Sequence, residues 1–500
     1  MRKVFCILIL MLSAVAYAQN GNGIRAKRGN CMPNQTEAET QSVRLMSPKK
    51  LATPNTQWDA NRTYRQLVIL VAFQDRSFAE DHDVLFYDSL FNHPGFNKGA
   101  GAGCVADYFR DQSGGVLNMK FDVYGPVTVD SCAKNNGTYG GSTFRKATQQ
   151  VINAEVPDFS LYDWNGNGRV NQIIFIYAGY GGNESSDKVD GCIWPNTSSF
   201  SSLKVNTDLI ASSYTASAEL WSNDVSCGIG TICHEFSHSL GLPDLYPTSS
   251  ASDEFSVLDE WDLMDGGNFT DDGWCPPNYS AHEKMLLGWL TPRELSETAV
   301  IEGLKPVSEG GTAYIVRHTD NEFFLLENRQ WKGWDYLIPG RGLLISHVDY
   351  LESAWTGNSV NNKADHHRYD LVHADNLNYT QWEDAISGSH YVHGHSKILS
   401  GSPYPFEGND ALTDTSIPAA TTFTDAGLLS KPITHIRMTD DGLVSFQFMS
   451  PFAGIKDVML KATPMAAYDL QGRQVPFTDM QSGTIYIIRY SDGTAKKVCQ

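Results

Sequence analysis

Positive charge is scarce in this chain of 500 residues, and long apolar stretches are confined to its first residues. Lysine and arginine number 38 against 57 aspartates and glutamates, which gives a formal net charge of −19. This balance argues against a surface that binds the phosphates of nucleic acid. Beyond the N-terminal run, no apolar stretch reaches the roughly 18 residues that a membrane-spanning helix needs. The length suggests roughly two to four domains, and the hydrophobic content of 41% is typical of a globular protein.

The N-terminal apolar run predicts export from the cytoplasm. A basic start and an apolar stretch lead to Ala16-Tyr17-Ala18, which has the small-x-small pattern of a cleavage site. We therefore expect residues 1–18 to be a signal peptide and the mature protein to be secreted or held at the cell surface. Residues 19–55 are polar and lack hydrophobic periodicity, so they are expected to form a linker or a pro-segment.

Cysteine is also sparse, with nine residues, one of which (Cys6) lies in the predicted signal peptide. The remaining even number permits disulfides in an exported chain, although the spacing dictates no pairs. Cys31 follows Arg28 in the predicted pro-segment. A thiolate there could occupy a zinc coordination site and keep an enzyme latent. The alternatives are a disulfide partner or an unused thiol.

The strongest chemical signal is a His-Glu-x-x-His sequence followed by x-x-Gly-x-x-Asp. On a helix, His234 and His238 lie one turn apart on the same side, where two imidazoles can bind zinc. Glu235 lies beside them and can transfer a proton. Four apolar residues fall on the opposite face of this helix: Ile229, Ile232, Phe236 and Leu240.

The third metal ligand is open to more than one interpretation. Gly241 favours the end of the helix, because glycine adopts the left-handed conformation without strain. The chain can then turn and bring Asp244 under the metal, which leaves a fourth position open. A glutamate further along the chain, Glu254 or Glu260, is the alternative ligand. We favour Asp244, because the turn at Gly241 brings it close.

A second element lies in the Gly-rich stretch from Trp261 to Gly267. Met264 there is similar to the methionine of the Met-turn in metzincin metalloproteases, where the thioether lies beneath the metal. A methionine of the core is the alternative. Metzincins often place a tyrosine near this turn, and Tyr246 or Tyr279 could fill that role here.

The stretch from His234 to Tyr246 resembles the immune inhibitor A family of secreted bacterial metalloproteases, peptidase family M6. The resemblance extends over residues 65 to 450 through five further stretches: Asp107 to Ser113, Ile176 to Gly181, Glu283 to Trp289, Leu325 to Arg329 and Gly342 to Tyr350. It implies a secreted, zinc-dependent protease, often with structural calcium.

A possible calcium loop lies upstream of the histidine motif. Its oxygen-bearing residues are spaced as in the first part of an EF-hand loop, at Asp163, Asn165, Asn167, Arg169 (through its carbonyl) and Asn171. The twelfth position is Ile174 instead of glutamate, so binding is expected to be weak. An Asn/Gly turn without calcium is the alternative.

The fold is predicted to be α+β, with a zincin or metzincin-like catalytic domain in residues 56–295. Four elements are expected there: a strand at Gln66–Phe73, a hairpin at Met119–Val129 turning at Gly125-Pro126, a helix at Ser142–Val156 and a strand at Ile173–Ala178. The capping box of Ser280 and Glu283 predicts a further helix that ends at Leu290.

The last two regions are expected to be rich in strands. Short apolar runs in residues 296–450 predict a β-rich continuation of the M6-like domain. His366-His367 and the histidines between His390 and His395 could form a second metal site, although loop histidines are favoured. Residues 451–500 predict a small β module that resembles the C-terminal sorting tails of exported Bacteroidota proteins.

Together these patterns predict a secreted zinc endopeptidase that cleaves extracellular proteins or peptides, with Glu235 as general base and acid. Zinc is the expected catalytic ion and calcium a structural one. We expect a monomer that binds no nucleic acid. The alternative is a non-catalytic surface protein in which the metal is structural, and a second alternative is a zinc hydrolase that cleaves another kind of bond.

Overall fold

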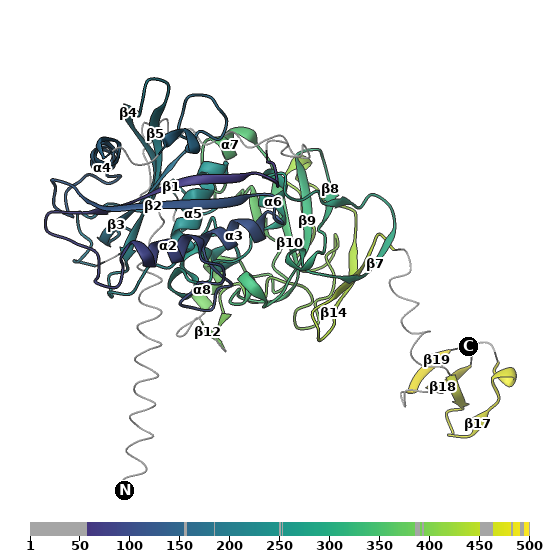
Figure 1. The fold of residues 1–500 in the computed structure, drawn as a ribbon. Coiled ribbons are helices and arrows are strands. Elements are labelled where there is room, and N and C mark those ends of the chain that lie inside the picture. The colour runs from purple at the N-terminus through teal and green to yellow at the C-terminus, as the bar shows by residue number, and fades with distance from the viewer. Residues whose placement is uncertain are drawn as a thin grey trace, which may run out of the picture.

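The computed structural model describes residues 58–499, apart from 155–157, 185, 250–251, 253, 386–390, 393–394, 451–463, 482–483 and 491–494 (Figure 1). The predicted signal peptide, the pro-segment and Cys31 lie outside the described residues. Within the described part, no helix combines the length and apolar character that a membrane crossing requires. The fold is mixed helix and sheet, as predicted.

The first part of the chain is built on a five-stranded sheet with the order β2-β1-β3-β5-β4. Its strands are β1 (Thr63–Ala72), β2 (Asn118–Thr128), β3 (Ile173–Tyr180), β4 (Asn196–Lys204) and β5 (Ile210–Leu220). All neighbouring pairs are parallel except β4, which runs antiparallel to β5 at one edge. The strands predicted at Gln66–Phe73 and Ile173–Ala178 are thus confirmed as β1 and β3.

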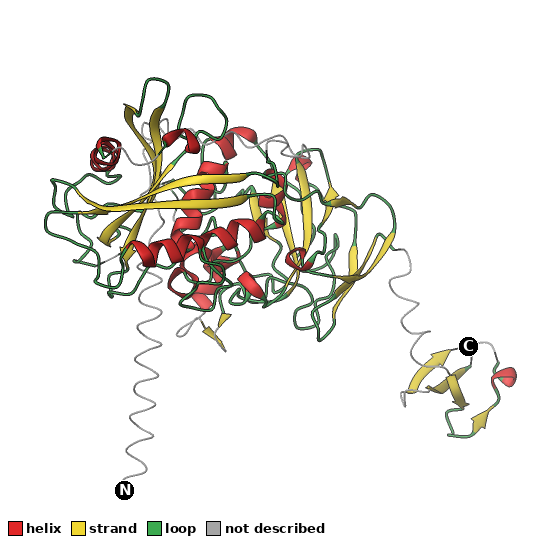
Figure 2. Cartoon of the chain, in the orientation of Figure 1, coloured by secondary structure: helices red, strands yellow, loops and turns green. Residues whose placement is uncertain are grey.

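Helices cover both faces of this sheet, because β1 and β3 are apolar on both sides (Figure 2). Val68 and Leu70 of β1 pack in one core with α2 (Val84–Asn92), α3 (Val105–Gln112) and α5 (Gly230–Leu240). Leu67 and Ile69 pack in a second core with α4 (Gly141–Asn153). Burial on both faces explains why β1 is a continuous apolar run instead of an alternating one.

The hairpin predicted at Met119–Val129 is wrong. Residues 119–128 lie in one strand, β2, which pairs with β1 in parallel. Gly125 and Pro126 form an irregularity between two paired stretches, because the register shifts between Ile69 and Val71. Gly125 has φ +110°, and a Cβ there would lie 2.7 Å from the carbonyl oxygen of Leu70. Glycine is therefore needed for a close approach within the sheet, and no chain reversal occurs.

The β-rich region contains a second five-stranded sheet and a three-stranded one, ordered β11-β10-β9-β8-β6 and β14-β15-β7. Their strands are β6 (Arg293–Glu294), β7 (Ala299–Leu304), β8 (Tyr314–Arg317), β9 (Glu322–Arg329), β10 (Gly342–Asp349), β11 (Tyr369–Leu371), β14 (Ile433–Met438) and β15 (Val444–Phe448). Shorter elements are α7 (Glu352–Thr356), α8 (Tyr379–Ala385), β12 (Tyr391–Val392) and β13 (His395–Ser396).

The β-rich region shares a core with the first sheet. Phe323 and Leu325 of β9 belong to the same buried cluster as α2, α3 and α5, whereas Phe324 and Leu326 face a third core with β14 and β15. The two regions therefore pack as one continuous interior. This shared core brings segments after residue 296 close to α5.

Helix α6 (Ala281–Leu286) begins as predicted and ends sooner. The Ser280 hydroxyl and the Glu283 carboxylate form the expected capping box. The helix stops before Leu290, because Gly288 adopts φ +72° and leaves the helical region.

The C-terminal module is a four-stranded antiparallel sheet with the order β17-β16-β18-β19. Its strands are β16 (Pro464–Tyr468), β17 (Gln474–Val475), β18 (Ile485–Tyr490) and β19 (Ala495–Cys499). The predicted β character of this segment is confirmed, and its sorting role stays a prediction. The thiols of Cys104, Cys132, Cys192, Cys227, Cys233 and Cys275 are free.

Candidate metal centre

The two motif histidines are buried side by side on α5. His234 is fully buried and His238 is 2% exposed, and their rings lie 4.9 Å apart, centroid to centroid. The helix ends at Gly241, which has φ +109° and donates its N–H to the His238 carbonyl. Leu242 donates to the Ser237 carbonyl, and these two bonds reverse the chain as predicted.

After this reversal, the Asp244 side chain returns to the histidine face. Its Oδ1 lies 3.1 Å from Nε2 of His234 and 3.3 Å from Nε2 of His238. Among the described residues, these three form the single group of at least three His, Cys, Asp or Glu side chains whose ligand atoms all lie within 4.8 Å of one another. Their arrangement is what a metal with one open position requires.

The outer nitrogens of both imidazoles are fixed by the backbone. Nδ1 of His234 lies 2.8 Å from the Leu263 carbonyl, and Nδ1 of His238 lies 2.8 Å from the Leu242 carbonyl. A carbonyl can only accept, so each Nδ1 carries a proton and donates it. In the neutral rings both Nε2 atoms then present lone pairs to a carboxylate.

Three buried acceptors that face one another repel unless a cation lies between them. Nε2 of His238 is buried and has no hydrogen-bond partner, which fits a metal ligand. Burial lowers the pKa of His238, but the Asp244 carboxylate outweighs this and raises it to about 9. Burial opposes ionisation of Asp244, yet the two histidines hold its pKa well below the usual range. The site therefore favours positive charge, whether as protons or as a metal ion.

Glu235 lies beside the ligands and is fully buried. Its Oε2 accepts a hydrogen bond of 3.0 Å from the Thr197 hydroxyl on edge strand β4, and its Oε1 has no hydrogen-bond partner. Burial raises the pKa of Glu235, against the opposing effect of the two histidines. The free oxygen and the raised pKa suit a group that accepts and returns a proton. Thr197 was not predicted, because it lies 38 residues from Glu235 in a segment with no recognisable pattern.

The Gly-rich stretch after residue 261 runs next to the ligands. The Leu263 carbonyl accepts from His234, and the Met264 carbonyl accepts from the N–H of Leu245 at 2.8 Å. Met264 is fully buried in the core that also holds Leu242. The ring of His234 and the backbone N–H of Leu245, which follows Asp244, are thus both tied to the stretch in which a Met-turn was predicted.

Two tyrosines were candidates for a role at this centre. The ring of Tyr246 lies nearly parallel to the ring of His234, with an interplanar angle of 10° and centroids 6.3 Å apart. Tyr279 instead forms a hydrogen bond with Ser237 and packs against Tyr108. The structure therefore brings Tyr246, and not Tyr279, against the ring of a candidate ligand.

The alternative ligands do not join the two histidines. The Glu254 carboxylate lies 2.7 Å from Nε2 of His367. Glu260 is buried, but neither glutamate forms a close group with His234 and His238 within the described residues.

Comparison with known proteins agrees with this geometry. Residues 52–288 match the family described as "Immune inhibitor A peptidase M6, catalytic domain". Residues 52–288 thus resemble a peptidase M6 catalytic domain, and we call them the M6 domain. The chain is 23% identical to pre-pro-metalloprotease PrtV of Vibrio cholerae, over 47% of this chain and 31% of that protein. It is 24% identical to immune inhibitor A of Bacillus thuringiensis subsp. alesti, over 45% of this chain and 39% of that protein. The match therefore spans less than two-fifths of either relative.

The M6 domain also contains the loop predicted to bind calcium. Asp163 accepts hydrogen bonds from the N–H groups of Asn167 (3.1 Å) and Gly168 (2.8 Å), and Asn171 accepts from Trp164 at 2.6 Å. These oxygens stabilise the turn itself. Gly166 and Gly168 have positive φ, as such a tight loop requires.

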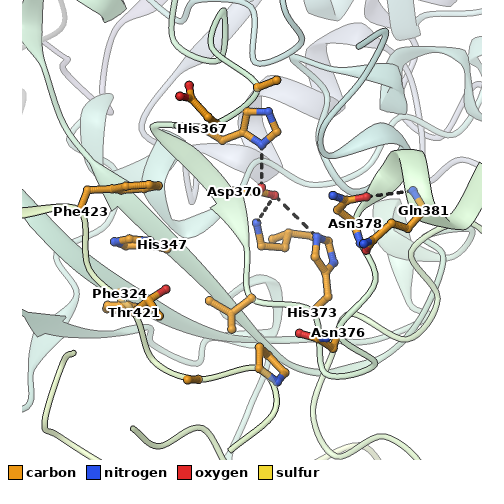
Figure 3. A pocket seen from close by; sticks show the side chains of 16 residues that line it. Phe324, His347, His367, Asp370, His373, Asn376, Asn378, Gln381, Thr421 and Phe423 are labelled. Carbon is orange, nitrogen blue, oxygen red and sulfur yellow. Dashed lines mark hydrogen bonds and ion pairs between the residues drawn. The ribbon is translucent and has the colours of Figure 1, made fainter. Parts of the chain in front are cut away.

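Outside the M6 domain, several histidines line a cavity of about 390 Å³ in the β-rich region (Figure 3). His367 lies 2.9 Å from Asp370, and Nε2 of His373 lies 3.7 Å from the same carboxylate. His366 pairs with Asp349 at 2.7 Å. Among the described residues, these histidines and their carboxylates form no group of three ligand atoms that lie within 4.8 Å of one another, so they are described best as loop histidines. Two further histidines of the sequence pattern, His390 and His393, lie outside the described residues.

Proposed function

We propose that this protein is a secreted zinc endopeptidase that hydrolyses peptide bonds in extracellular proteins. His234, His238 and Asp244 would hold the ion, and Glu235 would serve as general base and acid. The observation that carries this proposal is the buried convergence of three acceptor atoms beside a carboxylate oxygen that has no hydrogen-bond partner.

Zinc is the ion that the donor set fits best. Two imidazole nitrogens and one carboxylate oxygen are typical of catalytic zinc sites, whereas calcium and magnesium prefer oxygen ligands. When bound there, zinc would polarise a peptide carbonyl and acidify a water molecule. The hydrogen bonds from Nδ1 of both histidines would keep the rings oriented for binding.

The protein's own groups support a proton transfer at Glu235. The Thr197 hydroxyl occupies Oε2, so Oε1 is the atom left to accept a proton from the attacking water. The same oxygen can then give the proton to the leaving amine. Burial raises the pKa of this carboxyl, which makes it a better base than an exposed glutamate.

Strand β4 supports a binding mode for the substrate. It forms one edge of the first sheet and carries Thr197 next to Glu235. An extended peptide can add to such an edge through main-chain hydrogen bonds, which would place its backbone beside the catalytic carboxylate.

Three further parts of the proposal rest mainly on sequence. The signal peptide at residues 1–18 would direct export. The thiolate of Cys31 would occupy a zinc coordination position and keep the enzyme latent. The loop from Asp163 to Asn171 is proposed as a weak calcium site, in which the Arg169 carbonyl would also serve.

The decisive experiment compares the unaltered protein with Glu235→Gln. We expect casein cleavage by the unaltered protein to stop with a chelator and to return with zinc. Glu235→Gln keeps the shape of the side chain but cannot accept the proton, so the variant should bind zinc with unchanged affinity and cleave nothing. Cleavage by this variant would refute the role of Glu235. A zinc-bound unaltered protein that stays inactive after removal of the pro-segment would indicate that the metal is structural.

A further inference from the structure

The candidate third ligand is held by a residue that lies outside the M6 domain. Asn358 donates from Nδ2 to Oδ2 of Asp244, and the N–H of Asp244 donates to Oδ1 of Asn358, both at 2.7 Å. One amide side chain therefore contacts both the side chain and the backbone of the same aspartate. The two residues are 114 positions apart in the chain.

The backbone holds Asn358 rigidly in this position. It follows α7, whose end is closed by hydrogen bonds from Gly357 to Ser353 and from Ser359 to Ala354. Asn358 has φ +52°, a left-handed conformation that asparagine tolerates better than most residues. Trp355 of α7 is fully buried in the shared core.

Two neighbouring asparagines fix the chain that follows Asp244. The Oδ1 of Asn362 accepts from the N–H of Thr248 (2.7 Å) and of Ser249 (3.2 Å). The Nδ2 of fully buried Asn361 donates to the Leu245 carbonyl at 2.8 Å. We call Asn358, Asn361 and Asn362 the asparagine clamp.

We propose that Asn358 is a positioning residue of the metal centre, and that the clamp makes the β-rich region part of that centre. This inference rests on the proposed role of Asp244 as a zinc ligand. A carboxylate that turns freely can present either oxygen to a metal. Because Asn358 occupies Oδ2, Asp244 presents Oδ1 to the two imidazoles, in the orientation that the ion requires. Partners of this kind typically contribute about 10- to 100-fold to metal affinity.

The test measures metal binding by the full-length protein and needs no peptide cleavage. Asn358→Gly removes the amide and leaves the left-handed backbone unstrained. Asn376→Gly is the matched control, because Asn376 also has a left-handed φ of +59° and lines the cavity of the β-rich region instead of the metal centre. We expect Asn358→Gly to raise the zinc Kd about 10- to 100-fold, and Asn376→Gly to leave it unchanged.

A second variant covers the case in which Asn358→Gly fails to fold. Asn358→Asp keeps the shape and the left-handed preference, but it sets an oxygen against Oδ2 of Asp244. With Co²⁺ in place of zinc, its visible absorption bands should differ from those of the unaltered protein. Unchanged bands and an unchanged zinc Kd would overturn the proposal, as would an equal loss in Asn376→Gly. Casein cleavage by Glu235→Gln would refute the proposed function without affecting this result.

Discussion

The hydroxyl of Thr197 donates to both the main chain and the side chain of Glu235. It lies 2.6 Å from the carbonyl oxygen and 3.0 Å from Oε2. Edge strand β4 is thereby fastened to helix α5 at the candidate general base, and the orientation of that base depends on the sheet.

Replacing Thr197 with valine tests this relationship. The change keeps the branched shape but removes the hydroxyl, so Glu235 can rotate away from its reactive orientation. We expect kcat for peptide hydrolysis to fall at least about tenfold, because one hydrogen bond to a charged group contributes about 1.5–3 kcal/mol. KM and the zinc Kd should change little.

Thr215→Val is the matched control for Thr197→Val. Thr215 lies opposite Thr197 on β5, is 2% exposed, and its hydroxyl has no hydrogen-bond partner. This variant should keep full activity. An equal loss of kcat in both variants would assign the effect to packing of the sheet.

The identity of the third ligand can be decided by metal analysis. Asp244→Ala removes the only carboxylate that lies within 3.5 Å of either motif histidine in the described residues, and it should lose tightly bound zinc during dialysis. Glu254→Gln removes the alternative carboxylate, which pairs with His367, and should retain zinc. Retention of zinc by Asp244→Ala together with loss by Glu254→Gln would reverse the assignment.

The buried pair of Arg329 and Asp335 should be important for stability. Arg329 donates to Asp335 from Nε at 2.7 Å and from Nη2 at 2.6 Å, and both side chains are 3% exposed. Asp335→Asn removes the negative charge that is hydrogen-bonded to the buried guanidinium. We expect the free energy of unfolding in urea to fall by about 3–5 kcal/mol.

A neighbouring exposed pair provides the comparison for Asp335→Asn. Lys332 and Glu309 lie 3.1 Å apart, but their side chains are 49% and 39% exposed. Glu309→Gln should therefore change the free energy of unfolding by less than about 1 kcal/mol. Similar effects of the two substitutions would show that burial does not set the energy of the first pair.

Stability should depend on pH through His367. Burial lowers the pKa of this imidazole, but hydrogen bonds to Asp370 and Glu254 raise it to about 9. Since the folded pKa lies above the unfolded value of about 6.5, the stabilisation is complete below pH 6.5 and disappears as pH rises through 9. It should be on the order of 3 kcal/mol, because each pKa unit between 6.5 and 9 corresponds to about 1.4 kcal/mol.

His367→Gln measures that contribution. The difference in Tm between the unaltered protein and the variant should be largest near pH 6 and should shrink toward pH 9.5. A difference that stays constant over this range would contradict a charged His367.

The local sequence predicted the structure correctly wherever one segment alone decides it. The spacing of His234 and His238, the stop at Gly241 and the capping box at Ser280 are all present as predicted. The hairpin at Gly125-Pro126 was mispredicted, because Gly-Pro marks turns and irregular strands alike. Only the pairing of β2 with β1 distinguishes the two.

The sequence by itself determined the chemical groups of the candidate centre. These are two imidazoles one helical turn apart, an adjacent carboxylate, and a glycine that ends the helix so that Asp244 can lie beside the imidazoles. Those features depend on spacings within a dozen residues, which helix geometry fixes. Only the tertiary structure decided which distant side chains hold these groups, because Thr197 and Asn358 reach them through the folding of a sheet edge and a shared core. Contacts between residues that are 38 or 114 positions apart produce no periodic pattern in the sequence of a single chain.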